Sequence, residues 1–323
     1  MPEISFREAL RQSLREELLS DERVILMGED IGAYGGSYAV TKGFLEEFGP
    51  ERVRDTPISE SVIVGCGIGA AMGGLRPIVE LMTINFSLLA FDQIVNNAAK
   101  ISYMSAGQLH VPLVIRMASG AGSQLSSQHS QSLEGWYAHI PGLKVAVPYT
   151  PYDARGLLKT ACRDANPVIF IEHTALYSRK GEVPEEDYDL PFGQAEVYRE
   201  GKDVTLIGYS GSVYQANGAA DILAEQGCEA EVINLRTLRP LDVDTIIASV
   251  RKTHRVVVVE DDWKFGGFAG EIAAIIMEEA FDELDAPVAR ICGADVPIPY
   301  AKELEQAALP SERQIADAAL GLM

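Results

Sequence analysis

The sequence predicts an α/β protein of two domains, each with a mostly parallel sheet covered by helices. Short β-rich runs alternate with longer helical patterns up to about residue 180. The alternation stops in an acidic stretch with two prolines at residues 180–193, KGEVPEEDYDLPFG, and a second series of the same kind follows. The predicted boundaries are residues 1–183 for the first domain, 184–193 for a linker and 194–323 for the second domain.

Composition limits the partners and the compartment. The chain has 323 residues, of which 47% are hydrophobic, and its formal net charge is −20, so we expect neither nucleic acid nor an anionic membrane surface as a partner. Its four cysteines show no C-x-x-C pairing, which predicts neither a disulfide framework nor a zinc site. No apolar run reaches about 18 residues, and the charged N-terminus resembles neither a signal nor a transit peptide. The expected location is the cytoplasm.

The first element is a helix. Ser5 followed by Glu8 has the spacing of a capping box, in which each side chain satisfies a backbone N–H at the start of a helix. Apolar residues recur after it at helical spacing, at Phe6, Leu10, Leu14 and Leu18. This pattern predicts a helix that packs against the core.

Strands follow in order. Those of the first domain are RVILMG, RVRDTPI, RPIVELM, VPLVIRM, LKVAVP and NPVIFIEH. The runs near Val111 and Val168 are almost continuously apolar, as expected of strands buried on both faces of a sheet. In the second domain, strands at DVTLIGYS, EAEVINL, RVVVVED and APVARIC alternate with helices near residues 221–224, 246 and 275.

Two glycine clusters lie between a strand and a helix. Residues 65–70, GCGIGA, loosely fit a dinucleotide-binding fingerprint, but SESVIV precedes them and places the glycines inside the helix. There they favour close packing, against another subunit, over phosphate binding. The second cluster, GGFAG at residues 266–270, follows three acidic residues that would repel a phosphate, so packing is again favoured.

Other motifs give weaker signals. Residues 208–212, GYSGS, approach the G-x-S-x-G nucleophile elbow but lack its last glycine, which argues against an esterase. The five histidines have no metal-ligand spacing. His129 stands out because it lies in the polar run SSQHSQS after a strand, near the edge where open α/β sheets bind ligands. It is a candidate for proton transfer, with a purely structural role as the alternative.

Glu60 is the other candidate residue. It follows DTPIS, where a strand ends, and it begins the helix that contains the first glycine cluster. A carboxylate at the first helical position is stabilised by the helix dipole, so a structural role is possible. The sequence pattern by itself does not assign it a reaction.

Several blocks, spanning nearly the whole chain in order, resemble the beta subunits of the decarboxylating component of 2-oxo acid dehydrogenase complexes. They are DTPISE, GAAMGGLRPIVELMTINF, FDQIVNNAAK, QHSQS, PGLKVAVP, RDANPVIFIEH, INLRTLRPLD and GADVPIPYAK. Within this family they are most similar to the pyruvate type, with the acetoin type close behind. The resemblance implies an N-terminal thiamine diphosphate pyrimidine-binding (transketolase-like) domain and a transketolase C-terminal-like domain.

The resemblance also implies a role for Glu60. In this family thiamine diphosphate lies between two subunits, and the glutamate that matches Glu60 hydrogen-bonds a ring nitrogen of the aminopyrimidine. A charge-assisted bond there favours the imino tautomer, whose exocyclic nitrogen can remove the thiazolium proton. The cofactor then supplies the nucleophile and accepts the electrons released by decarboxylation.

This chain carries half of such a cofactor site. Related enzymes hold Mg²⁺ and the diphosphate with a GDG segment and a later NN pair, but residues 28–30 are GED and Asn96-Asn97 is too far away. The resemblance therefore implies that an alpha subunit holds Mg²⁺ and the diphosphate, in an α₂β₂ heterotetramer. The helix at residues 65–74 would suit that contact.

Further residues are assigned by the same resemblance. Met82 and Phe86 match the residues that line the aminopyrimidine pocket, and His129 matches a histidine that assists substrate binding and reductive acetyl transfer to the lipoyl group. A possible structural potassium site matches Leu113, Ala161, Cys162, Asp164 and Asn166. Without the resemblance, core packing explains Met82 and Phe86 equally well, and helix capping explains Asp164 and Asn166.

The function predicted from the sequence is oxidative decarboxylation of pyruvate and acetylation of a lipoyl domain on a dihydrolipoyl acetyltransferase core. The acidic run at residues 278–285, predicted to be a helix, is a candidate docking surface for that core, with a solvated charge run as the more common alternative. Alternatives for the whole protein are an acetoin dehydrogenase beta subunit, a noncatalytic assembly subunit and, more weakly, a nucleotide-binding dehydrogenase. A branched-chain enzyme is disfavoured because it usually has polar residues at the positions of Met82 and Phe86.

Overall fold

A computed structural model describes residues 1–323 and contains two compact units. The first unit comprises residues Met1–Ser119 and Trp136–Phe192, and the second comprises Gly120–Gly135 and Gly193–Met323. The predicted α/β class is confirmed for both. The predicted boundaries need two corrections, because residues 120–135 belong to the second unit and residues 184–192 belong to the first.

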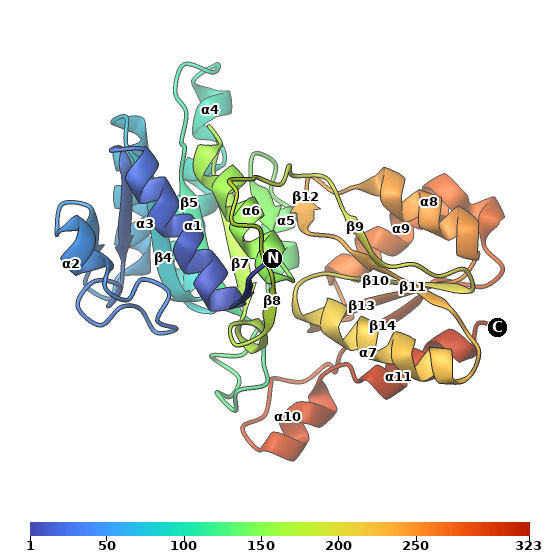
Figure 1. The fold of residues 1–323 in the computed structure, drawn as a ribbon. Coiled ribbons are helices and arrows are strands. Elements are labelled where there is room, and N and C mark those ends of the chain that lie inside the picture. Colours follow the sequence, from blue (N-terminus) through green and yellow to red (C-terminus); the bar gives the residue numbers. More distant parts are fainter. The chain divides into compact units, whose positions relative to one another are not determined.

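The first unit alternates strands and helices as the sequence predicts (Figure 1). Its elements are β1 (Glu3–Ser5), α1 (Phe6–Ser20), β2 (Val24–Gly28), α2 (Phe44–Phe48), β3 (Val53–Asp55), α3 (Glu60–Met72), β4 (Arg76–Thr83), η1 (Phe86–Ala90), the π-helix η2 (Gln93–Ala98), α4 (Ile101–Met104), β5 (Val114–Ser119), β6 (Lys144–Ala146), α6 (Pro151–Arg163), β7 (Val168–His173), η3 (Thr174–Leu176) and β8 (Lys180–Glu182). The short helix α5 (Glu134–Ala138) spans a boundary between the chain segments.

The sheet of the first unit is parallel, with its strands in the order β6-β7-β5-β4-β2-β3. The two central strands β5 and β7 are buried along their whole length, as their continuous apolar sequence predicts. Helix α3 packs against β4, and α1 packs against α6. A separate antiparallel pair, β1 and β8, joins the two ends of the unit's chain.

Helix α1 begins at Phe6, where the sequence predicts it. The Glu8 backbone N–H donates to Ser5 Oγ at 3.2 Å, which is the half of the predicted capping box that the structure forms. The apolar residues of the repeat (Phe6, Leu10, Leu14, Leu18) are all buried. Helix α6 has the complete box, in which Thr150 Oγ1 accepts from the Asp153 N–H and the Asp153 side chain accepts from the Thr150 N–H.

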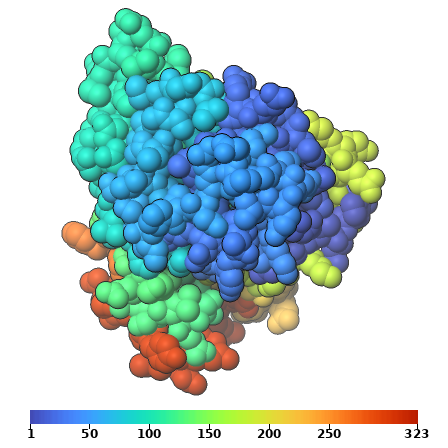
Figure 2. All heavy atoms as spheres, turned by 90° about the vertical axis from the view of Figure 1, so that its left-hand side faces the viewer, coloured from blue at the N-terminus to red at the C-terminus, as the bar shows by residue number.

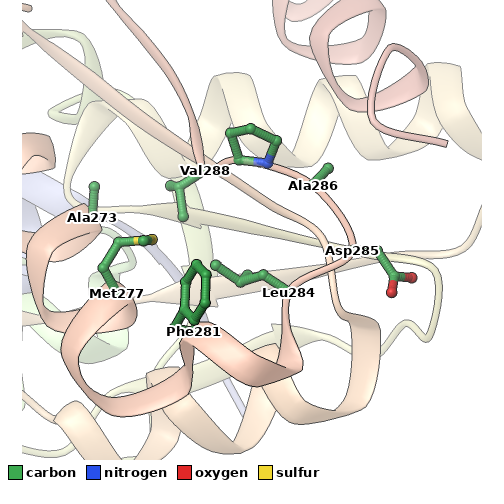
Figure 3. Close-up of a pocket in the computed structure, with 8 residues that line it drawn as sticks. Ala273, Met277, Phe281, Leu284, Asp285, Ala286 and Val288 are labelled. Atoms are coloured by element: carbon green, nitrogen blue, oxygen red, sulfur yellow. The ribbon is translucent and has the colours of Figure 1, made fainter.

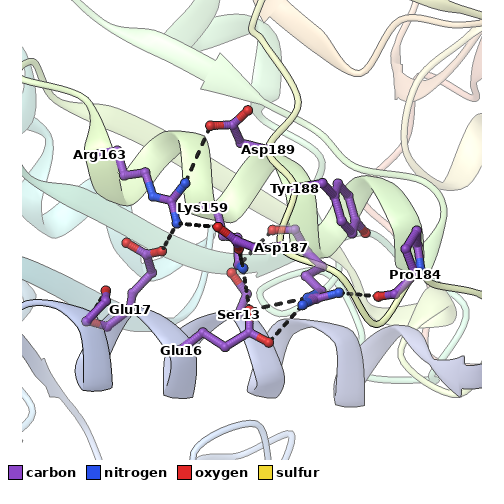
Figure 4. A network of polar contacts seen from close by, with 12 residues as sticks. Ser13, Glu16, Glu17, Lys159, Arg163, Pro184, Asp187, Tyr188 and Asp189 are labelled. Carbon is purple, nitrogen blue, oxygen red and sulfur yellow. Dashed lines mark hydrogen bonds and ion pairs between the residues drawn. The ribbon is translucent and has the colours of Figure 1, made fainter.

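Residues 184–192 pack on the first unit and do not form a free linker (Figure 4). Asp187 forms ion pairs with Lys159 and with Arg163, both from α6. Tyr188 stacks on Tyr152, with ring centroids 4.6 Å apart, and its hydroxyl donates to the Tyr152 carbonyl. The sequence pattern misses this because the acidic residues of the segment have their cationic partners in a helix far away along the chain.

The second unit has a five-stranded sheet in the order β14-β13-β10-β11-β9, in which only β9 is antiparallel to its neighbour. Helices α8 and α9 lie on one side of this sheet, and α7 and α11 lie on the other (Figure 1). The elements are β9 (Glu196–Arg199), β10 (Val204–Gly208), α7 (Gly211–Glu225), β11 (Ala230–Asn234), β12 (Thr237–Arg239), α8 (Val243–Thr253), β13 (Val256–Trp263), α9 (Phe268–Ala280), η4 (Phe281–Glu283), β14 (Ala289–Gly293), α10 (Lys302–Ala308) and α11 (Glu312–Leu320).

Both glycine clusters contain a glycine that packs closely within the chain, while the packing of the first cluster against another subunit stays a prediction. The first lies inside α3, where a Cβ on Gly67 would come within 2.7 Å of Val79 Cγ1 on β4. In the second, a Cβ on Gly267 would come within 2.2 Å of Glu260 Oε1, at the N-terminus of α9. Glycine lets the backbone approach its neighbours in each case.

Candidate active site

Two buried carboxylates meet at the carboxyl edge of the first unit's sheet. Glu29 follows the last residue of β2, and Glu60 begins α3, with four residues between the end of β3 and Glu60. Strands β2 and β3 are parallel neighbours, so the segments that follow them start at the same edge. The exposed fractions are only 5% for Glu29 and 3% for Glu60. The fold therefore places two acids together that are 31 positions apart in the sequence.

The surroundings of Glu29 favour its protonated form. Burial, the charge of Glu60, a side-chain hydrogen bond to Glu60 and the charge of Asp30 together raise the pKa of Glu29 to about 7. The Glu60 charge favours the neutral form of Glu29, because like charges repel. Glu29 Oε1 has no hydrogen-bond partner within the chain, so one buried acceptor remains available at the site.

We expect Glu29→Gln to change how stability depends on pH. The folded-state pKa of Glu29 is raised, so the folded chain holds a proton that the unfolded chain has lost, and stability falls as pH rises from about 4.5 through about 7. Glutamine removes this ionisation. In thermal unfolding of the cofactor-free protein, the Tm of the variant minus the Tm of the wild type should increase from pH 5 to pH 8. Parallel curves across this range would contradict the pKa assignment.

Met82 and Phe86 belong to segments beside this pair. Met82 lies at a bulge in β4, where the pairing with β5 shifts between Leu81 and Thr83, and such bulges redirect side chains. Phe86 is the first residue of η1, which packs against α3, the helix that Glu60 begins. Both side chains are partly exposed. They are therefore available to line a site as well as to pack.

A buried ion cluster supports the carboxyl end of β4. The Arg116 guanidinium donates to Glu80 Oε2 at 2.6 Å and to both Glu172 oxygens, at 2.6 and 2.9 Å. The Tyr177 hydroxyl donates to Glu172 Oε2 at 2.8 Å. These side chains line a small internal cavity together with Met82. No sequence motif marks this cluster, because its members come from three separate strands and a turn.

His129 lies in the second unit, on the segment at residues 120–135. Its side chain is exposed, and its backbone N–H donates to the Ser126 carbonyl at 3.2 Å. The segment follows β5, as predicted, and it has no strand or helix before α5. Glu60 therefore belongs to the first unit and His129 to the second. The assignment of each residue rests on contacts within its own unit.

The five residues predicted to hold potassium lie together where β5 and β7 begin and α6 ends. The Val168 N–H donates to the Leu113 carbonyl at 2.9 Å, and Asp164 Oδ1 accepts from the Asn166 N–H at 2.9 Å. Arg76 donates to the carbonyls of Cys162 and Asp164, each at 2.9 Å. Lys144 pairs with the Asp164 carboxylate.

The donor chemistry suits a hard monovalent cation, because the groups are carbonyls and one carboxylate. A bound ion would share two of these oxygens with Arg76 and the carboxylate with Lys144. Potassium binding stays a prediction.

Two other readings find little support. Ser210 has the backbone angles of a strained strand-to-helix turn (φ 49°, ψ −126°). The last glycine of the nucleophile-elbow motif is replaced by Ser212, whose hydroxyl donates to the Tyr209 carbonyl at 2.8 Å and closes the turn. No group of three or more histidine, cysteine, aspartate or glutamate side chains could hold a metal ion.

None of the helices has both the length and the apolar composition needed to span a membrane.

The acidic run at residues 278–285 is not one helix, which corrects the prediction. Helix α9 ends at Ala280, and the 3₁₀ turn η4 continues to Glu283 before the chain becomes extended at Leu284. Beside it lies an open pocket of about 470 Å³, shown in Figure 3. Its lining is mainly apolar and comprises Ala273, Met277, Phe281, Leu284, Asp285, Ala286, Pro287 and Val288. The candidate docking surface thus combines exposed acids with an apolar pocket.

The family models and the curated relatives give consistent matches. The pyrimidine-binding domain of transketolase matches residues 2–180, and the transketolase C-terminal domain matches residues 193–315. The chain is 52% identical over 316 residues to the pyruvate dehydrogenase E1 component subunit beta of Rickettsia felis, covering 98% of this chain and 97% of the relative. It is 53% identical over 321 residues to the mitochondrial subunit beta-2 of the same component from Oryza sativa subsp. japonica, covering 98% and 85%.

A solved structure, described as a split gene transketolase and an inactive beta4 tetramer, has a TM-score of 0.80 and 23% identity to this chain. The match covers 99% of this chain and 98% of that one. At this identity it supports the fold alone.

Proposed function

The chain belongs to the family of pyruvate dehydrogenase E1 component beta subunits, and on that premise we propose that it supplies half of a thiamine diphosphate site that decarboxylates pyruvate. The enzyme would then transfer the acetyl group to a lipoyl domain, toward acetyl-CoA. The observation that carries the proposal is the buried pair Glu29 and Glu60 at the carboxyl edge of a pyrimidine-binding domain.

The residues fit the aminopyrimidine of this cofactor. A ring nitrogen and an exocyclic amino group need hydrogen-bonding partners in an otherwise dry site. Glu60 is buried at the start of α3, and Glu29 Oε1 has no partner within the chain. Bound thiamine diphosphate supplies the carbon nucleophile and the electron sink for decarboxylation.

Each named residue has one task in this proposal. Glu60 would hydrogen-bond the ring nitrogen of the bound cofactor and stabilise its protonated form. Glu29, whose pKa is raised to about 7 by burial and by Glu60, would hold a proton beside Glu60. Met82 and Phe86 exclude water, which strengthens the charge interaction of Glu60. His129 binds the substrate and assists acetyl transfer.

We further propose an alpha subunit that holds Mg²⁺ and the diphosphate. Residues 28–30 are GED, and this chain has no cluster of metal-binding side chains. An α₂β₂ heterotetramer would complete the site. The contact surface we assign to α3 is a stripe of Val62, Cys66, Gly69 and Gly73, all exposed and spaced at three or four residues. Figure 2 shows the side of the first unit on which α2 and α3 lie.

Two glycines of α3 provide a matched test of this contact. Gly69→Ala faces open space and should stabilise the isolated chain by about 0.5–1 kcal/mol, yet weaken its binding to the alpha subunit. Gly67→Ala should destabilise the isolated chain by about 1–3 kcal/mol, because its Cβ meets Val79. Thermal unfolding and a binding titration separate the two effects. Unchanged affinity in Gly69→Ala would remove α3 from the interface.

The acyltransferase core is the second proposed partner. The acids around η4 would attract a basic binding domain, and the pocket beside them would take an apolar side chain. We also propose a structural potassium ion at Leu113, Ala161, Cys162, Asp164 and Asn166. It would bind in addition to the Arg76 and Lys144 side chains that already contact Cys162 and Asp164.

The test is reconstitution with an alpha subunit of the pyruvate type. The mixture should sediment as α₂β₂ and show thiamine diphosphate-dependent reduction of a dye acceptor with pyruvate, while either chain alone should not. Activity on acetoin and not on pyruvate would assign the chain to the acetoin enzyme. Assembly without any activity would assign it a noncatalytic role.

A further inference from the structure

The segment at residues 120–131 has an irregular backbone that needs external support. Gly120 and Gly122 have φ values of 86° and 104°, and the non-glycine residues Gln124 and Ser126 also lie in the left-handed region, at 55° and 66°. Residues other than glycine disfavour this region, because their Cβ atom comes too close to the backbone. A backbone of this kind persists only where neighbouring groups hold it.

Glu305 provides such support from within the same unit. It lies on α10, its exposed fraction is 1%, and its Oε1 accepts the backbone N–H groups of Gly122 at 2.9 Å and Gln124 at 3.1 Å. Its Oε2 also accepts from the Gln124 N–H, at 3.2 Å. Hydrogen bonds to an ionised carboxylate are about twice as strong as neutral ones. The buried Glu305 carboxylate therefore stabilises the backbone of this segment.

Apolar contacts and a loop closure add to these bonds. Ala121 packs in a small buried cluster with Ile298 and Ala308. The ends of the segment are joined by the Gly120 N–H, which donates to the Gln131 carbonyl at 3.2 Å. Figures 1 and 2 both show the green segment beside the red α10. His129 thus lies between two fixed points, the Glu305 carboxylate and the closure at Gln131.

We propose that Glu305 is a positioning residue that holds residues 120–131 in the conformation that presents His129. It touches no substrate and acts through the backbone of the segment. The inference deepens the function proposed above, since the role of His129 comes from there. Glutamine at position 305 would keep one acceptor oxygen, but it would place its amide NH₂ against the Gln124 N–H in place of Oε2 and would lose the charge.

The test uses the assembled α₂β₂ enzyme with Glu305→Gln and with Glu303→Gln as the matched control, because Glu303 is exposed on the same helix. Amide hydrogen exchange of residues 120–131 should accelerate by about tenfold in Glu305→Gln and stay unchanged in the control. Acetylation of an isolated lipoyl domain should fall on the order of tenfold. Glu305→Asp, which keeps the charge but is one methylene shorter, should recover part of both losses.

A double-mutant cycle distinguishes positioning from general stabilisation. In a His129→Gln background, Glu305→Gln should lower the rate of lipoyl acetylation by less than about twofold, because the group that Glu305 positions is already absent. Unchanged exchange in Glu305→Gln, or the same loss in both backgrounds, would overturn the proposal. If the wild-type enzyme does not acetylate the lipoyl domain, the proposed function fails, and the exchange measurement still decides whether Glu305 holds the segment.

Discussion

Glu60→Gln should lower turnover on pyruvate by roughly 10²- to 10⁴-fold in the reconstituted enzyme, the range of a positioned acid–base group. The amide has nearly the same shape as the carboxylate but cannot accept or stabilise a proton on the ring nitrogen. Glu60 is 3% exposed, so bulk water cannot take its place. The loss should appear in kcat, measured by dye reduction at saturating cofactor and pyruvate, with little change in the assembly.

A control variant separates catalysis from helix capping. Glu312 is the first residue of α11, as Glu60 is of α3, so Glu312→Gln loses the same interaction with the helix dipole. That interaction is worth about 0.3–1 kcal/mol. We expect Glu312→Gln to cost a little stability and no activity. Equal, small effects in both variants would reduce Glu60 to a structural residue.

Arg116→Met should destabilise the first unit strongly, by about 3–5 kcal/mol. Methionine fills much of the volume but leaves Glu80 and Glu172 without the guanidinium that bonds both. Burial already raises the pKa of Glu80, and Arg116 partly offsets this. Without Arg116 the carboxyls must take up protons, so the loss should be smaller at pH 5 than at pH 8. Thermal or urea unfolding measures it.

The comparison for Arg116 is Arg54, whose ion pair with Glu51 lies on the surface. Arg54→Met should cost less than about 1 kcal/mol, since water solvates the remaining carboxylate. Adding Glu80→Gln and Glu172→Gln to Arg116→Met should recover part of the stability, because the unpaired buried charges are removed. A loss in Arg116→Met as small as in Arg54→Met would show that the cluster contributes little.

The α/β class followed from local patterns, and so did the individual elements. The capping signal before Phe6 and the apolar runs of β5 and β7 act within a few residues, so their structures could be predicted. The glycines of α3 were placed inside a helix for the same reason. Packing rules that operate along the chain are visible in the sequence.

Relations between distant segments could not be predicted in this way. Glu29 was noted only as a departure from a phosphate-binding motif, although it follows a strand parallel to the one before Glu60. The strand order that makes them neighbours depends on tertiary packing. Glu305 and Gly122 are likewise 183 positions apart. The attachment of residues 184–192 to α6 was missed because the cationic partners of these acidic residues lie in a helix that is distant along the chain.

The central claim is that the Glu60 carboxylate activates the cofactor. Its most direct test is the rate of deuterium exchange at the thiazolium carbon of thiamine diphosphate bound to the reconstituted enzyme, without substrate. The wild type should exchange this proton at least about 100-fold faster than Glu60→Gln. Equal rates in the two proteins, with the cofactor bound in both, would contradict the account.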